Sequence, residues 1–455
     1  MALPGLGLAV PLEPESQPST IYEIEERMEW RFEIAFGLEL EVKLLSGNAE
    51  VFGTELAPKQ TYIFTGTSAA IYTWHGCRIE VKGDFQSQYI ADETPMTMYT
   101  NLHFALERIR EQATVNMGQG PRILILGPSD AGKTSLAKIL TAYASRAGRQ
   151  PITVNLDPRE GMLTIPGTIS TAAFSSVIDV EQGWGSSPTN GPTQVPVKLP
   201  LVYYYGLANP EENPDVYKPL ATRAALSVMN RLQEDEEARV TGCIIDTPGS
   251  ISYGKRNYEL IHHIISEFSV SVLVTLGSER LASEMARKFH GQKAGTSETI
   301  TVLKLDKSGG CVDRDIEHMH QTQRAQLREY FHGERTNSLS PHTQQVDFDQ
   351  LTIFKIVDSS ALLSSLLPGG EEEDAASAIY EQVMPSPEMQ NSVLAIVDAE
   401  RNDSPQSVRD ANVIGFIHIS EVDEKKKKVK LLSPASGRLP NKAMIWGTCP
   451  EPVDI

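Results

Sequence analysis

Residues 122–135 read Arg-Ile-Leu-Ile-Leu-Gly-Pro-Ser-Asp-Ala-Gly-Lys-Thr-Ser, and this stretch decides the fold. Its first five residues have the apolar character of a buried strand, and residues 135–147 have the pattern of a helix. Residues 127–134, at the junction, fit the phosphate-loop pattern G-x-x-x-x-G-K-[ST] in the strand-to-helix context that the pattern requires. We therefore predict a nucleotide-binding α/β domain.

Each residue type in this loop has a physical task. Glycines let backbone N–H groups surround phosphate oxygens, and the helix N-terminus adds partial positive charge. Lys133 is expected to reach the outer phosphates, and the Thr134 hydroxyl is expected to bind Mg²⁺. The loop therefore predicts a bound nucleoside triphosphate with Mg²⁺, and the residues assigned to nucleotide binding in the loop are Asp130, Ala131, Gly132, Lys133, Thr134 and Ser135.

Two aspartates follow strands that are predicted to neighbour the loop. Asp246 follows the strand over residues 242–245 and is expected as the second acidic element near Mg²⁺. Asp157 follows the strand over residues 152–156, where it could act as a general base or hold a magnesium-bound water. Either residue could instead be an ordinary turn aspartate. Thr134, Asp157 and Asp246 form the predicted metal site.

Residues 246–249 also contain the D-x-x-G pattern of GTPases. A guanine-specific enzyme should then carry N/T-K-x-D after a later strand, but residues 303–307 read Leu-Lys-Leu-Asp-Lys. The residue that would read the base is missing, so the sequence disfavours a GTPase.

Arg280 and Arg287 lie two turns apart on one predicted helix. They could close over a bound phosphate as a lid, and they could equally form a solvated helix face. The sequence leaves both interpretations open.

Strand and helix patterns divide the chain into parts. Residues 1–20 read as a flexible tail, and the alternating apolar residues of 21–99 predict a β-sandwich. Strands and helices alternate over residues 100–335, including a connecting helix, which predicts a parallel sheet with the phosphate loop. Residues 336–455 return to strand patterns. The expected fold class is α/β, a central parallel-sheet domain flanked by an N-terminal β-sandwich and a small C-terminal β-rich domain.

Composition excludes several classes of function. The 455 residues include 41 Lys and Arg against 59 Asp and Glu, a net charge of -18, which argues against non-specific coating of nucleic acid. No apolar run is long enough to predict a membrane span. The four cysteines lie far apart, which favours a reducing compartment and no structural zinc site.

This arrangement resembles the Clp family of pre-mRNA cleavage-complex subunits, within the polynucleotide 5′-hydroxyl kinase superfamily. The resemblance covers nearly the whole chain. The stretches that carry it are 50–56, 64–77, 127–135, 155–157 with 165–167, 304–310, 328–333, 415–417, 432–434 and 438–440.

The chain departs from the active kinases of that superfamily at two places. In active members the catalytic Asp precedes Val-Gly-Gln, whereas residues 158–160 read Pro-Arg-Glu. A T-x-G-W clasp holds the RNA end in active members, whereas residues 247–250 read Thr-Pro-Gly-Ser. Loss of an aromatic platform forfeits about 1–3 kcal/mol per stacked base. The departures resemble those of fungal members, which implies a subunit that holds ATP without kinase turnover.

The resemblance also implies partners and further contacts. It implies a nuclear subunit of the mRNA 3′-end cleavage and polyadenylation machinery. Its partners would be the cleavage-factor scaffold that binds the RNA polymerase II tail and other subunits, with RNA possible and no membrane. The adenine would lie between the N-terminal and central domains, with Glu29 the best-placed contact and Ser68 in a second loop near the base.

An active RNA 5′-hydroxyl kinase is the alternative hypothesis. Asp157 would deprotonate the 5′-hydroxyl, Lys133 and Mg²⁺ would stabilise the γ-phosphate charge, and Arg280 or Arg287 would close as a lid. The intact phosphate loop and Asp157 support this alternative, and Ser250 at the clasp weakens it.

Overall fold

A computed structural model describes residues 19–175, 178–181, 200–293, 298–333, 338–356, 380–434 and 436–455. The chain forms two units, one of residues 1–51 and 55–94 and the other of residues 52–54 and 95–455. Residues 1–18 of the predicted tail lie outside the described residues.

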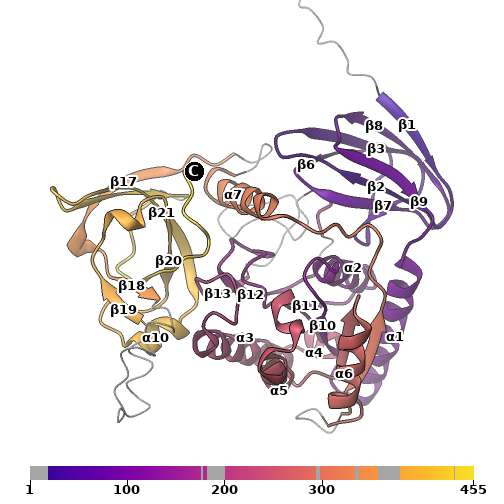
Figure 1. Ribbon diagram of the computed structural model, residues 1–455. Coiled ribbons are helices and arrows are strands. Elements are labelled where there is room, and N and C mark those ends of the chain that lie inside the picture. Colours follow the sequence, from indigo (N-terminus) through magenta and orange to yellow (C-terminus); the bar gives the residue numbers. More distant parts are fainter. Residues whose placement is uncertain are drawn as a thin grey trace, which may run out of the picture. The chain divides into compact units, whose positions relative to one another are not determined.

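The N-terminal unit is built from antiparallel strands (Figure 1). The strands are β1 (Ser19–Ile24), β2 (Glu29–Glu33), β3 (Glu39–Gly47), β4 (Glu50–Val51), β5 (Thr54–Glu55), β6 (Thr61–Thr65), β7 (Ser68–Tyr72), β8 (Cys77–Gly83) and β9 (Ser87–Ala91). One sheet has the order β1-β8-β3-β6, and the other has the order β4-β7-β2-β9 with β5 at its edge. Phe32 of one sheet meets Phe64 of the other edge-to-face, with ring centroids 5.4 Å apart. The predicted sandwich is confirmed.

The central sheet carries the phosphate loop. Its strands are β10 (Arg122–Leu126), β11 (Ile152–Asn155), β12 (Thr168–Ala173), β13 (Leu201–Tyr204), β14 (Cys243–Asp246), β15 (Val272–Leu276) and β16 (Thr301–Leu305). They lie in the order β13-β12-β11-β14-β10-β15-β16. The strands from β11 to β16 in this order are parallel, as predicted, whereas β12 and β13 extend the edge antiparallel. The sequence analysis did not predict β12 and β13.

The same part of the chain carries the helices (Figure 1). They are α1 (Met96–Asn116), α2 (Lys133–Arg146), α3 (Pro214–Glu234), α4 (Glu236–Thr241), α5 (Glu259–Glu267), α6 (Glu279–Phe289) and α7 (Ile316–His332), with 3₁₀ turns η1 (Gly249–Tyr253) and η2 (Lys255–Tyr258). Helix α1 packs against α2, and α3 packs against α4 and α5. Among the described residues, none of the helices combines the length and the apolar character needed to cross a membrane.

The C-terminal part adds a mostly antiparallel sheet to the same unit. Its elements are β17 (His342–Asp347), η3 (Phe348–Gln350), β18 (Ile353–Ile356), β19 (Tyr380–Val383), η4 (Pro387–Met389), β20 (Val393–Val397), α10 (Pro405–Asp410), β21 (Val413–Asp423), β22 (Lys428–Ser433) and β23 (Met444–Trp446). The strand order is β17-β22-β21-β20-β23-β18-β19, and within it β18 and β23 run parallel. The predicted β-rich C-terminal part is confirmed.

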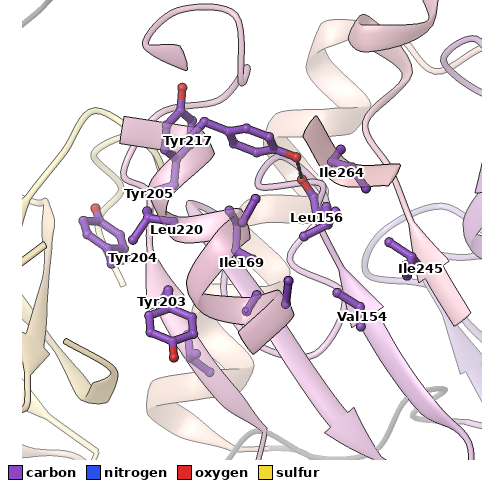
Figure 2. Close-up of a cluster of buried hydrophobic side chains, with 14 of the residues drawn as sticks. Val154, Leu156, Ile169, Tyr203, Tyr204, Tyr205, Tyr217, Leu220, Ile245 and Ile264 are labelled. Carbon is purple, nitrogen blue, oxygen red and sulfur yellow. Dashed lines mark hydrogen bonds between the residues drawn. The ribbon is translucent and has the colours of Figure 1, made fainter. Parts of the chain in front are cut away.

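One apolar core runs from the central sheet into the C-terminal sheet. Tyr204 of β13 and Phe416 of β21 meet edge-to-face, with centroids 6.2 Å apart, and both belong to this core. Figure 2 shows the central part of the core, in which the Tyr217 hydroxyl of α3 donates a 2.9 Å hydrogen bond to the Leu156 carbonyl. Leu156 directly precedes Asp157, so this core fixes the backbone on which the candidate site is built.

Candidate functional site

The phosphate loop leaves the amides at the start of α2 free of side-chain capping. Helix α2 starts at Lys133, and its N-cap Gly132 has φ +85° and makes no side-chain cap hydrogen bond. Asp130 is also in the left-handed region, at φ +55°. A methyl group on Gly127 would lie 2.7 Å from the Leu276 carbonyl oxygen, so the tight turn needs glycine there. Uncapped amides at a helix N-terminus suit an anion such as phosphate.

Two side chains of the predicted metal site are bonded to each other, and Lys133 is bonded within the phosphate loop. Thr134 Oγ1 donates a 2.6 Å hydrogen bond to Asp246 Oδ2, and Asp246 Oδ1 accepts the Thr247 N–H at 3.0 Å. Lys133 is 7% exposed, and its Nζ donates to the Pro128 carbonyl at 2.8 Å. The phosphate loop and the end of β14 are therefore already joined by the pair that is predicted to bind the metal.

Asp157 is held in the same buried region by its own turn. Its N–H donates to Asn155 Oδ1 at 2.9 Å, and its Oδ1 accepts the Arg159 N–H at 3.0 Å. Burial and the charge of Glu160 together raise the pKa of Asp157 to about 7, and the charge of Lys133 opposes the shift. Burial likewise raises the pKa of Asp246 to about 6, against the opposing charge of Lys133. The two carboxyl groups thus lie where additional positive charge would stabilise their ionised forms.

The donor set fits a magnesium-bound nucleotide. In the part of the chain that the structure describes, no group of three or more His, Cys, Asp or Glu side chains is arranged to hold a metal ion. Mg²⁺ usually takes one or two protein oxygen ligands and completes its shell with phosphates and water. Thr134, Asp246 and Asp157 would supply such oxygens, and the loop amides would supply the phosphate contacts.

Arg314 contacts the phosphate loop, and the sequence analysis missed it. Its Nε donates to Asp130 Oδ1 at 2.6 Å, and its two terminal nitrogens donate to the carboxylate of Glu160 at 3.0 and 2.5 Å. Burial alone would lower the pKa of Arg314, but the bonds to Glu160 and Asp130 raise it above its usual value. The available signal was an arginine four residues after Gly310, but it belongs to no periodic pattern.

The residues at the clasp position pack on the phosphate loop itself. A methyl group on Gly249 would lie 2.4 Å from the Ser129 nitrogen, and Thr247 Oγ1 donates to the Ile125 carbonyl at 2.6 Å. Ser250 Oγ is buried without a hydrogen-bond partner among the described residues. The close approach of Gly249 to Ser129 therefore explains why the D-x-x-G pattern of residues 246–249 ends in glycine.

The two predicted lid arginines lie on α6. The Arg280 side chain is 88% exposed, and its Nε binds Glu284 Oε1 of the same helix at 3.1 Å. Arg287 lies in the last turn of the helix. These contacts describe a solvated helix face, one of the two interpretations left open by the sequence, and the lid role stays a prediction.

The two residues expected near the base lie in the N-terminal unit. Glu29 is buried, and its carboxylate accepts hydrogen bonds from Arg31 Nε at 2.6 Å and from Thr94 Oγ1 at 2.7 Å. Ser68 begins β7, where it is exposed and pairs with Glu33 in the sheet register. Their contacts with adenine stay predictions.

Family comparisons match the three parts of the chain. The model described as "mRNA cleavage and polyadenylation factor CLP1 P-loop" matches residues 127–333. The model described as "N-terminal beta-sandwich domain of polyadenylation factor" matches residues 23–113. The model described as "Pre-mRNA cleavage complex II protein Clp1" matches residues 339–450.

Relatives and solved structures agree with these matches. The mRNA cleavage and polyadenylation factor clp1 of Botryotinia fuckeliana is 54% identical, with 100% of each chain covered. The corresponding factor of Phaeosphaeria nodorum is 51% identical, covering 100% of this chain and 99% of its own. A structure of a Clp1p–Pcf11p complex is 32% identical with TM-score 0.85, covering 95% of this chain and 98% of the other. The chain belongs to the Clp1 family of mRNA cleavage and polyadenylation factors.

Proposed function

We propose that the chain is a nuclear subunit of the mRNA 3′-end cleavage and polyadenylation machinery that holds ATP and Mg²⁺ without kinase turnover. The observation that carries the proposal is the contrast within one site. The phosphate loop, Lys133 and the Thr134–Asp246 pair are intact, with a 2.6 Å bond between the last two. The residues that would hold an RNA end in an active kinase are replaced.

The substrate side of the site supports retention rather than transfer. Ser250 stands where active kinases of the superfamily carry a stacking tryptophan, so the chain lacks that aromatic platform. Pro158, next to Asp157, restricts the backbone and lacks an N–H donor. Glu160 replaces the glutamine of active members and is bound to Arg314. ATP, when bound, would supply phosphate charges that satisfy Lys133 and the loop amides.

The comparisons support the partner side of the proposal. One similar structure is of Clp1p with a segment of Pcf11p, and another describes an extended Pcf11p–Clp1p interface and ATP loss in a point mutant. We infer that this chain likewise binds a Pcf11-type scaffold, the subunit expected to contact the RNA polymerase II tail. A ligand that binds the folded state stabilises it, so retained ATP would stabilise the surface that the partner recognises.

We also propose that the functional parts follow the boundaries 21–99, 100–335 and 336–455. The family models match residues 23–113, 127–333 and 339–450, which supports this division in outline.

The test combines nucleotide analysis with partner capture. Purified chain should release intact ATP on denaturation, and Lys133→Ala with Thr134→Ala should release none and capture less of the Pcf11-type partner. Glu317→Gln, an exposed change on α7, is the control that should keep both properties. Unchanged partner capture and thermal stability in the double variant would refute a supporting role for the nucleotide.

An active RNA 5′-hydroxyl kinase is the second candidate, and one observation favours it. Asp157 is 8% exposed and has a pKa raised by burial to about 7, a range that suits a general base. Transfer of labelled γ-phosphate from ATP to a 5′-hydroxyl RNA, lost on Asp157→Asn, would establish this candidate instead.

A further inference from the structure

A short connection between β16 and α7 lies against the phosphate loop, and we name residues 306–315 the strap. A methyl group on Gly132 would lie 2.8 Å from Cys311 Sγ, and one on Gly277 would lie 3.2 Å from Lys307 Cβ. Arg314 adds an ion pair with Asp130 at 2.6 Å. The strap therefore touches the phosphate loop at two of its residues and the end of β15 at a third position.

Arg314 joins three separate segments of the chain. Its guanidinium binds Asp130 of the phosphate loop through Nε and Glu160 of the loop after β11 through both terminal nitrogens. Its backbone N–H also points to Asp130 Oδ2 at 3.4 Å. The three side chains are 15–30% exposed, so the charges are partly shielded from water. A two-point guanidinium–carboxylate bond fixes orientation as well as distance.

Asp130 is the residue in the phosphate loop on which this contact acts. It holds φ +55°, a conformation that costs about 1–2 kcal/mol for a residue with a side chain, although Asp tolerates it better than most. The bond from Arg314 stabilises this conformation, and Glu160 in turn fixes Arg314. Asp130 lies two residues before Gly132, the N-cap of α2, so its backbone sets how the loop amides are presented.

We propose that Arg314 and Glu160 are positioning residues of the nucleotide site, which hold Asp130 and thereby keep the phosphate loop in its anion-binding shape before nucleotide arrives. The inference rests on the proposed function, because it assumes that this loop binds ATP. Preorganisation of this kind raises affinity by removing an ordering cost from the binding step. Neither residue needs to contact the nucleotide for this effect.

The test measures nucleotide binding on the full chain with four variants. They are Glu160→Gln, Arg314→Gln, the double variant, and Arg314→Lys, which keeps the charge but cannot bind two carboxylates through one planar fork. The probe is a fluorescent ATP analogue with Mg²⁺, followed by equilibrium titration and by chase with unlabelled ATP. Glu317→Gln serves as the matched control, because it removes a carboxylate three residues from Arg314 that is bonded to Gln321 instead.

The expected results separate positioning from a general structural role. Glu160→Gln and Arg314→Gln should each weaken binding about tenfold, which corresponds to about 1.4 kcal/mol. The double variant should be no weaker than Arg314→Gln alone, because both residues act through one contact. Arg314→Lys should lie between wild type and Arg314→Gln, and Glu317→Gln should match wild type.

Two failures can be told apart. If the wild-type chain binds the analogue and all variants bind it equally well, the positioning role is overturned and the proposed function stands. Additive losses in the double variant overturn it as well, since they indicate two independent contributions. Wild-type chain that binds no nucleotide overturns the proposed function and this inference with it.

Discussion

Replacing Gly132 by alanine adds one methyl group to the phosphate loop and tests the packing of the strap. Gly132 has φ +85°, a conformation that costs an L-residue about 1–2 kcal/mol. The new Cβ would also lie 2.8 Å from Cys311 Sγ, closer than carbon and sulfur atoms tolerate. Overpacking of this size costs about 1–3 kcal/mol. Gly132→Ala should therefore lose about 2–5 kcal/mol of unfolding free energy, and its phosphate loop should retain less ATP.

Gly148 offers a matched control at the other end of α2. It has φ +75°, and a methyl group there would meet nothing within 4 Å. Gly148→Ala should therefore show the conformational cost without the collision and should keep its ATP. Cys311→Ala in the Gly132→Ala background should recover the part that is due to the collision, while Cys311→Ala alone completes the cycle.

The assay is thermal unfolding of nucleotide-free protein, with ATP content measured in parallel on protein as purified. A change of 1 kcal/mol shifts the midpoint by about 2–4 °C for domains of 150–250 residues, so the two glycine variants should be resolved. Equal midpoints for Gly132→Ala and Gly148→Ala, with no recovery on removing the Cys311 thiol, would refute the packing of the strap on the loop.

Three further predictions follow from buried contacts. The pKa of Asp157 is about 7 in the folded state and 3.8 in the unfolded state, so between these values the folded state holds a proton that the unfolded state has lost. The free energy of unfolding should therefore fall by up to about 1.4 kcal/mol per pH unit as the pH rises from 4 to 7. Thermal midpoints of nucleotide-free Asp157→Asn should fall less steeply with pH, keeping the part that Asp246 supplies up to about pH 6, and curves parallel to those of wild type would contradict the prediction. Tyr217→Phe removes the 2.9 Å bond to the Leu156 carbonyl and should cost about 1–3 kcal/mol in urea unfolding, while an unchanged midpoint would show the bond to be dispensable. Residue 167 has φ +87°, and Gly167→Ala would place a methyl group 2.2 Å from the Cys449 carbonyl oxygen. Limited proteolysis should therefore cut the C-terminal part of this variant faster, and a wild-type digestion pattern would contradict that contact.

Much of the fold could be predicted because its strands carry strong local patterns. The apolar run of residues 122–126 and the alternation in residues 38–44 specify a buried and a half-buried strand without reference to the rest of the chain. Strand β12 escaped prediction because its sequence, Thr-Ile-Ser-Thr-Ala-Ala, has little apolar character although all but its last residue is buried. Such a strand is specified by its neighbours β11 and β13, and local patterns do not report neighbours.

The residues of the candidate site were likewise only partly predictable from the sequence. Lys133, Thr134 and Asp246 were predicted because strand ends and the phosphate loop place them by rule, and the 2.6 Å bond between Thr134 and Asp246 agrees with that reasoning. Arg314 could not be found because its partners, Asp130 and Glu160, lie 184 and 154 residues away in the sequence. Only the folded chain brings those charges together.

The most direct test of retained but unused ATP is transfer of labelled γ-phosphate to a 5′-hydroxyl RNA oligonucleotide, run beside Lys133→Ala and an assay of the nucleotide that co-purifies. The account predicts no transfer, with intact ATP in the wild-type protein and none in Lys133→Ala. Transfer by the wild-type protein that disappears in Lys133→Ala would contradict it and make Asp157 the catalytic base to examine next.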